Sequence, residues 1–216
     1  MKKNIVTLIT ILATIYYIAN TLLNADFSNG KSLLIFLIFI FPYVFRNLLM
    51  GYFLIHSFFQ KAKDIDDSNL TTLVSLFGTN LSVFVGLFVN LQTATPNLSL
   101  LFMGTILSLI IFPFYLAGLI TLGYNLTILP EAKSLNTKGI YSISRHPLYL
   151  CYIVWFVLQN LVCQTWIMVF ISIIQIVLLI LRAKYEETIL EKNFPEYKEY
   201  RESVYWIGRI ENNQSE

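Results

Sequence analysis

Long apolar segments separated by short polar ones are the feature that most constrains how this chain can fold. A helix needs about 20 mostly apolar residues to cross a bilayer. Hydrophobic residues make up 56% of the chain and charged residues 13%, whereas a soluble domain carries about 25% charged residues. We therefore predict an all-α integral membrane protein with about six transmembrane helices. The expected helices cover residues 4–24, 32–59, 70–91, 98–124, 147–162 and 164–184.

The fifth segment is the shortest. At about 1.5 Å per residue, a helix over 147–162 reaches about 24 Å, less than the roughly 30 Å of a bilayer core. We expect it to form a tight hairpin with the sixth helix around residues 160–165. The first segment lacks the short apolar core and cleavage site of a signal peptide, so we expect it to stay as a membrane helix.

The basic residues are distributed unevenly between the connecting segments. If the N-terminus is cytoplasmic, 13 of the 15 lysines and arginines lie on the cytoplasmic side, Lys31 lies outside and Arg46 falls within the second helix. Such a bias follows the positive-inside rule. We expect a multi-pass protein of a bacterial inner membrane, with both termini in the cytoplasm and membrane lipids around it. The net charge of +2 is small and dispersed, which argues against a nucleic-acid partner.

The two cysteines, Cys151 and Cys163, lie in apolar stretches without the spacing of metal ligands or of a disulfide framework. We interpret both as small buried hydrophobic residues and expect no metal site.

Arg145 and His146 stand directly before Pro147 and a long apolar run. Proline suits the first turn of a helix and disfavours helical geometry in the residue before it, which places His146 near the helix N-cap. The unpaired N–H groups of that turn, together with Arg145, favour a carboxylate or phosphate. The alternative is a pair of side chains that only reach the lipid headgroups.

A second charged cluster covers residues 182–204, where the sixth helix should leave the membrane. Glu186 and Glu187 lie in it, and Pro195 should end the helix. A short cytosolic amphipathic helix should follow, with one apolar face formed by Tyr197, Tyr200 and Val204.

The expected hairpin brings both charged clusters to the same cytoplasmic end. A zwitterionic amino-acid head would fit between the Arg145–His146 corner and the two glutamates. The alternative is a charged tail that lies on lipid headgroups. Within the membrane, Arg46 is a candidate functional residue, although pairing inside the helix bundle explains it as well.

The stretch "SLNTKGIYSISRHPLYLCY" resembles the isoprenylcysteine carboxyl methyltransferases and their prokaryotic relatives, and so does the tail "YEETILEKNFPEYKEYR". The resemblance extends over about residues 120–204, since the preceding "LGYNLTILPEAK" also resembles bacterial members. In this chain Asn136 replaces the usual Val, Cys151 replaces a Gly, and "SVYWIG" replaces an Arg-Val-Pro ending. The first stretch matches the family pattern at Leu135, Thr137, Gly139, Tyr141, Arg145, His146, Pro147 and Tyr149.

The resemblance implies S-adenosylmethionine as cofactor, in a pocket that opens to the cytosol. Its carboxylate would contact Arg145 and His146, and its ammonium Glu186 or Glu187. The resemblance also implies that the adenosine and the rest of the pocket are lined by Leu135, Thr137, Gly139, Tyr141, Leu148 and Tyr149.

The implied reaction is methyl transfer to a carboxylate of a lipid-like or isoprenylcysteine-like acceptor, which would come from the bilayer. Arg201 is the first candidate to hold the acceptor carboxylate, and Arg46 is the second. We divide the chain into membrane helices at 1–124 and a methyltransferase core at 125–216. Three alternatives stay open here: a phospholipid N-methyltransferase, a sterol-type reductase that binds NADPH, and a non-enzymatic membrane protein with a degenerate site.

Overall fold

The computed structural model describes residues 5, 7–12, 15–16, 19, 41–59, 61–66, 68–77, 98–163 and 165–206. This part of the chain is mostly helical, with one antiparallel pair of two-residue strands in which Asp64 lies opposite Ala132. Residues 69–77 are also helical. The named elements are α3 (Phe41–Phe58), β1 (Asp64–Ile65), α5 (Leu98–Leu122), η2 (Gly123–Asn125), β2 (Glu131–Ala132), η3 (Gly139–Ser142), α6 (Pro147–Cys163), α7 (Trp166–Asn193) and α8 (Tyr197–Ser203).

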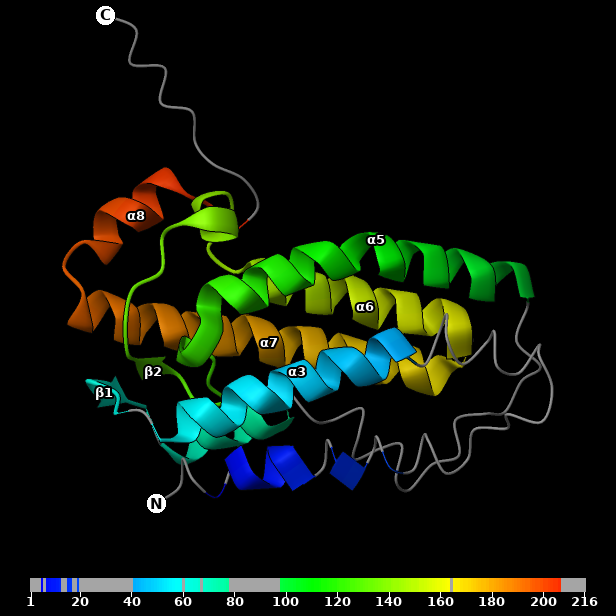
Figure 1. The fold of residues 1–216 in the computed structure, drawn as a ribbon, viewed down its shortest axis with the longest axis horizontal. Helices are drawn as coiled ribbons and strands as arrows, with labels where there is room; N and C mark the ends of the chain where they lie inside the picture. The colour runs from blue at the N-terminus through cyan, green and yellow to red at the C-terminus, as the bar shows by residue number, and fades with distance from the viewer. Residues whose placement is uncertain are drawn as a thin grey trace, which may run out of the picture.

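The axes of the four long helices are roughly aligned, with α6 antiparallel to the other three, and the short elements gather at one end of them (Figure 1). The C-terminal ends of α3, α5 and α7 and the N-terminal end of α6 lie at that end, together with η3, α8 and the strand pair. Helix α5 packs against α6 and η3, and α6 packs against α7. The strand pair, η3 and α8 therefore form one cap over one end of the bundle.

Two helices in the described part of the chain are long and apolar enough to cross a membrane, at Phe102–Leu122 and Trp166–Asn193. A shorter apolar helix lies at Pro147–Leu158. These lengths agree with an all-α membrane protein whose fifth helix is short. Parts of the first three predicted segments lie outside the described residues, namely 32–40, 78–91 and most of 4–24. The number of six spans therefore stays a prediction.

Helix α7 extends beyond the apolar segment at 164–184 and continues to Asn193. Its first turn is capped by Thr165, whose side chain accepts a hydrogen bond from the backbone N–H of Met168. The helix ends before Pro195, as the sequence predicts. Glu186 and Glu187 are therefore carried by the same rigid helix as the apolar span.

The main apolar core joins α3, α5, α6 and the segment after η2. Its buried members include Leu54, Tyr115, Leu119, Leu129 and Leu148. Helices α5 and α6 approach each other closely at Gly118, where an added Cβ would lie 2.9 Å from Cδ2 of Leu148. The absence of a side chain at Gly118 thus allows Leu148, in the first turn of α6, to pack directly against α5.

Replacement of Gly118 by Val should destabilise the protein, because the new side chain overlaps Leu148. Overpacking of this kind costs about 1–3 kcal/mol, which corresponds to a fall of several degrees in Tm. Thermal unfolding in detergent, followed by circular dichroism, measures it. Gly51→Val is the matched control, since a Cβ at Gly51 meets no atom within 4 Å. Equal Tm values for the two variants would contradict this account of the α5–α6 contact.

Candidate active site

The start of α6 has the predicted form. The helix begins at Pro147, and His146 precedes it with its carbonyl accepting a hydrogen bond of 3.1 Å from the N–H of Leu150. The backbone N–H of His146 donates to Oγ of Ser144 at 3.2 Å. This arrangement fixes Arg145 and His146 at the end of the helix bundle where α7 carries its acidic residues.

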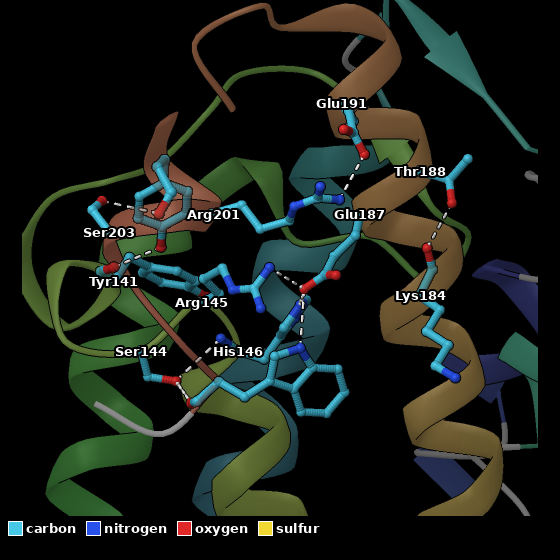
Figure 2. A network of polar contacts seen from close by, with 12 residues as sticks. Tyr141, Ser144, Arg145, His146, Lys184, Glu187, Thr188, Glu191, Arg201 and Ser203 are labelled. Atoms are coloured by element: carbon cyan, nitrogen blue, oxygen red, sulfur yellow. Dashed lines mark hydrogen bonds and ion pairs between the residues drawn. The ribbon is translucent and has the colours of Figure 1, made fainter. Parts of the chain in front are cut away.

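The carboxylate of Glu187 is the meeting point of the two charged clusters, as Figure 2 shows. Its Oε1 lies 3.0 Å from Nη1 of Arg145 and 2.9 Å from Nε2 of His146. The indole Nε1 of Trp206 donates to the same oxygen at 3.0 Å. The side chains of Arg145 and Glu187 are 10% and 16% exposed. The Arg145–His146 corner therefore faces Glu187 as predicted, but the groups are in direct contact, which leaves no space between them for the predicted amino-acid head.

Some polar atoms around this carboxylate have no described partner. Within the described part of the chain, the contacts of Glu187 all end on Oε1 and none on Oε2. Nε of Arg145 is buried without a hydrogen-bond partner. Buried donors are usually satisfied, so these atoms leave both a cationic donor and an anionic acceptor for a ligand. Such a donor set fits the carboxylate and the ammonium of an amino-acid head.

Glu186 belongs to a different network, although it is adjacent in sequence. Its Oε1 accepts a hydrogen bond from the hydroxyl of Tyr149 at 2.7 Å and lies 3.5 Å from Nη2 of Arg182. The buried Arg182 also donates to the carbonyl of Thr127 at 2.5 Å and lies over the ring of Tyr149. This network ties α7 to α6 and to the segment after η2. Glu186 as a ligand of the ammonium stays a prediction, while its contacts here are structural.

Arg182 is the first residue of the charged cluster at 182–204, where the sequence predicts that the sixth helix leaves the membrane. The structure shows it buried, with contacts to Glu186, Tyr149 and Thr127. Its position four residues before Glu186 was a usable signal, because residues at i and i+4 share a helix face.

Three buried tyrosines support the loop side of the site. The hydroxyl of Tyr200 donates to the carbonyl of Tyr141 at 2.6 Å, which joins α8 to η3. Burial raises the pKa of Tyr200 to about 12, and it also raises the pKa of Tyr141 and Tyr197. All three phenols therefore stay protonated at neutral pH. Tyr197, Tyr200 and Val204 pack with Ala132 and Ile189 in one apolar cluster.

The other residues implied by the resemblance lie around this centre in different settings. Leu135 packs on the α8 cluster, and Leu148 and Cys151 are buried in the main core. Gly139 opens η3 with φ +60°, a conformation that glycine adopts without strain. The ring of Tyr149 is stacked on His146 with centroids 5.2 Å apart, and Thr137 is half-buried in the loop before η3.

Arg201 lies near the centre but has its own partner. Its Nη1 is 2.9 Å from Oε2 of Glu191, and both side chains are exposed. Glu191 is one helical turn beyond Glu187 on α7, so Arg201 lies at the outer rim of the site (Figure 2). Arg46 lies within α3, but its side chain is outside the described part of the chain. Both residues stay predictions for binding the acceptor.

Trp206 is the site residue that sequence reasoning missed. The carbonyl of Tyr205 accepts a hydrogen bond of 3.1 Å from the N–H of Arg145, and that of Trp206 accepts from Oγ of Ser144. The indole ring lies 4.7 Å from the imidazole of His146. The altered ending "SVYWIG" was the available signal, but it gave no indication that the tail returns to the start of α6.

Comparison with known proteins supports the resemblance over part of the chain. Residues 121–192 match the model of the isoprenylcysteine carboxyl methyltransferase family. This segment is one third of the chain and includes η3, α6 and nearly all of α7, while α8 and Trp206 lie outside it. A search of curated proteins finds no match.

Replacement of Glu187 by Gln should lower stability, because it leaves the half-buried Arg145 without its ion pair. Removal of one partner from a largely buried pair costs several kcal/mol, and partial exposure here reduces this to about 1–3 kcal/mol. Thermal unfolding in detergent measures the change. Glu191→Gln on the same helix is the matched control, since its exposed pair with Arg201 contributes about 1 kcal/mol or less. Similar Tm losses for both variants would show that the Glu187 contacts add no particular stability.

Proposed function

We propose that the chain is an S-adenosylmethionine-dependent methyltransferase of the membrane, since residues 121–192 match the model of the isoprenylcysteine carboxyl methyltransferase family. Its acceptor is a carboxylate on a lipid-like or isoprenylcysteine-like molecule. The observation that carries the proposal is the half-buried Glu187 beside Arg145 and His146 at the end of the α6–α7 hairpin.

The residues at this centre can bind a zwitterionic head without rearrangement of their ion pair. Arg145 offers its buried Nε to the cofactor carboxylate, and Glu187 offers Oε2 to the ammonium. The existing contact between Arg145 and Glu187 holds both groups in place, which reduces the cost of ordering them on binding. By the family resemblance, the backbone around Thr137, Gly139 and Tyr141 would flank the nucleoside.

S-adenosylmethionine, when bound, supplies a methyl group on a positively charged sulfur. An ionised carboxylate acceptor needs no general base, so the protein acts by alignment and by exclusion of water. Arg201 is our candidate to hold the acceptor carboxylate, because it lies one turn of α7 beyond Glu187. To do so it would exchange Glu191 for the acceptor.

The apolar surface of the long helices suits an acceptor that is dissolved in the bilayer. Phe170, Ile173 and Val177 on α7 are exposed and follow the helical spacing of one face. A lipid chain along this face would extend toward the end of α7 that carries Glu187. The uneven distribution of basic residues supports a cytoplasmic position for this end of the bundle.

The purified protein should transfer the methyl group of tritiated S-adenosylmethionine into a bacterial lipid extract. The labelled product should release methanol on treatment with base, because a carboxyl methyl ester is base-labile. Label in a base-stable product would indicate an amine acceptor, such as a phospholipid amine. Heat-inactivated protein is the control, and the absence of any transferred label would argue against the carboxylate acceptor.

His146→Ala and Glu187→Ala should each weaken the binding of S-adenosylmethionine by about 1–3 kcal/mol, the contribution of one charge-assisted hydrogen bond. This corresponds to a Kd about 5- to 150-fold higher. Isothermal titration calorimetry on the folded fraction measures it. Glu191→Ala is the control, since its carboxylate contacts only the exposed Arg201 among the contacts described here. Unchanged binding in both variants would remove this site assignment, and NADPH binding by the wild type would favour a reductase.

A further inference from the structure

We infer that Trp206 is a positioning residue for the amino-acid head of the cofactor. By its hydrogen bond to Oε1 of Glu187, the indole leaves Oε2 as the oxygen that accepts the ammonium. The inference rests on the proposed function and adds to it a residue that lies outside the matched family segment.

The contacts of the Glu187 carboxylate with described residues all fall on Oε1. Arg145, His146 and Trp206 all lie within 3.0 Å of this single oxygen. A carboxylate oxygen has two lone-pair sites, so three neighbours fill its capacity. A further donor is therefore directed to Oε2, which has no partner among the described residues.

Aromatic contacts orient the side chain of His146. Its ring contacts two aromatic rings, with the centroid of Tyr149 at 5.2 Å and that of Trp206 at 4.7 Å. The Tyr149 ring is nearly parallel to the imidazole, at 4°. These contacts fix the imidazole plane so that Nε2 faces Glu187, and Trp206 supplies one of the two.

Backbone contacts of the tail place the indole of Trp206. The carbonyl of Tyr205 is bound by the N–H of Arg145, and the carbonyl of Trp206 is bound by Oγ of Ser144. Val204, directly before them, is buried in the α8 cluster. The segment 204–206 is thus held on both sides, and Trp206 is presented to Glu187 by the same loop that carries Arg145 and His146.

The test compares two ligands that differ in the amino-acid head. S-adenosylhomocysteine has the carboxylate and the ammonium, whereas 5′-methylthioadenosine has the same nucleoside thioether without them. Trp206→Phe keeps an aromatic ring and removes the N–H donor. We expect the Kd of S-adenosylhomocysteine to rise about tenfold and that of 5′-methylthioadenosine to change less than about twofold, because the loss acts through Glu187.

Two controls separate positioning from loss of structure. Trp166→Phe removes an indole that is 89% exposed at the other end of α7, and it should leave both Kd values unchanged. In a Glu187→Gln background, Trp206→Phe should add less than about twofold, since the coupled acceptor has already been altered.

A second measurement does not require the Trp206 variant to fold. The chain has three tryptophans, so Trp155→Phe with Trp166→Phe leaves Trp206 as the single tryptophan. S-adenosylhomocysteine should change its emission, and 5′-methylthioadenosine should not.

The possible outcomes are distinct. An equal Kd of S-adenosylhomocysteine in the wild type and in Trp206→Phe overturns the inference and leaves the proposed function standing. An equal loss for both ligands also overturns it, because the effect would then lie in pocket shape. If the wild type binds neither ligand, the proposed function fails, and the inference fails with it.

Discussion

One half-buried carboxylate holds the functional end of this molecule together. Glu187 receives Arg145 and His146 from the loop before α6 and Trp206 from the tail after α8. Three segments that are distant in sequence therefore converge on one helix, α7. A charged side chain that loses its partner away from water is destabilising. The contacts of Glu187 therefore fix the loop and the tail relative to the two apolar helices.

The local features of this end were predictable from sequence because each has a short-range physical cause. Pro147 favours the first turn of a helix and thereby locates His146, and Pro195 ends α7. The antiparallel hairpin then places Glu187 opposite Arg145. These elements depend on backbone geometry and on the length of apolar segments, which a single sequence displays directly.

Other features depend on contacts between distant segments, and sequence reasoning did not find them. Trp206 is 19 residues from Glu187, and nothing in the tail predicts that its carbonyls return to Arg145 and Ser144. Arg182 was interpreted as a residue of the membrane edge, whereas it is buried against Tyr149 and Thr127. In both cases the partners lie far away in the sequence, and their positions are set only by the packed fold.

The continuity of α7 through its two glutamates has a consequence for how the chain can change in length. Successive residues on an α-helix are rotated by about 100°, so Glu186 and Glu187 point into separate networks on one uninterrupted rod. Insertion of a single residue between Trp166 and Glu186 would turn both acids out of phase with α6. Only length changes that restore the angular phase of the helix preserve both networks together.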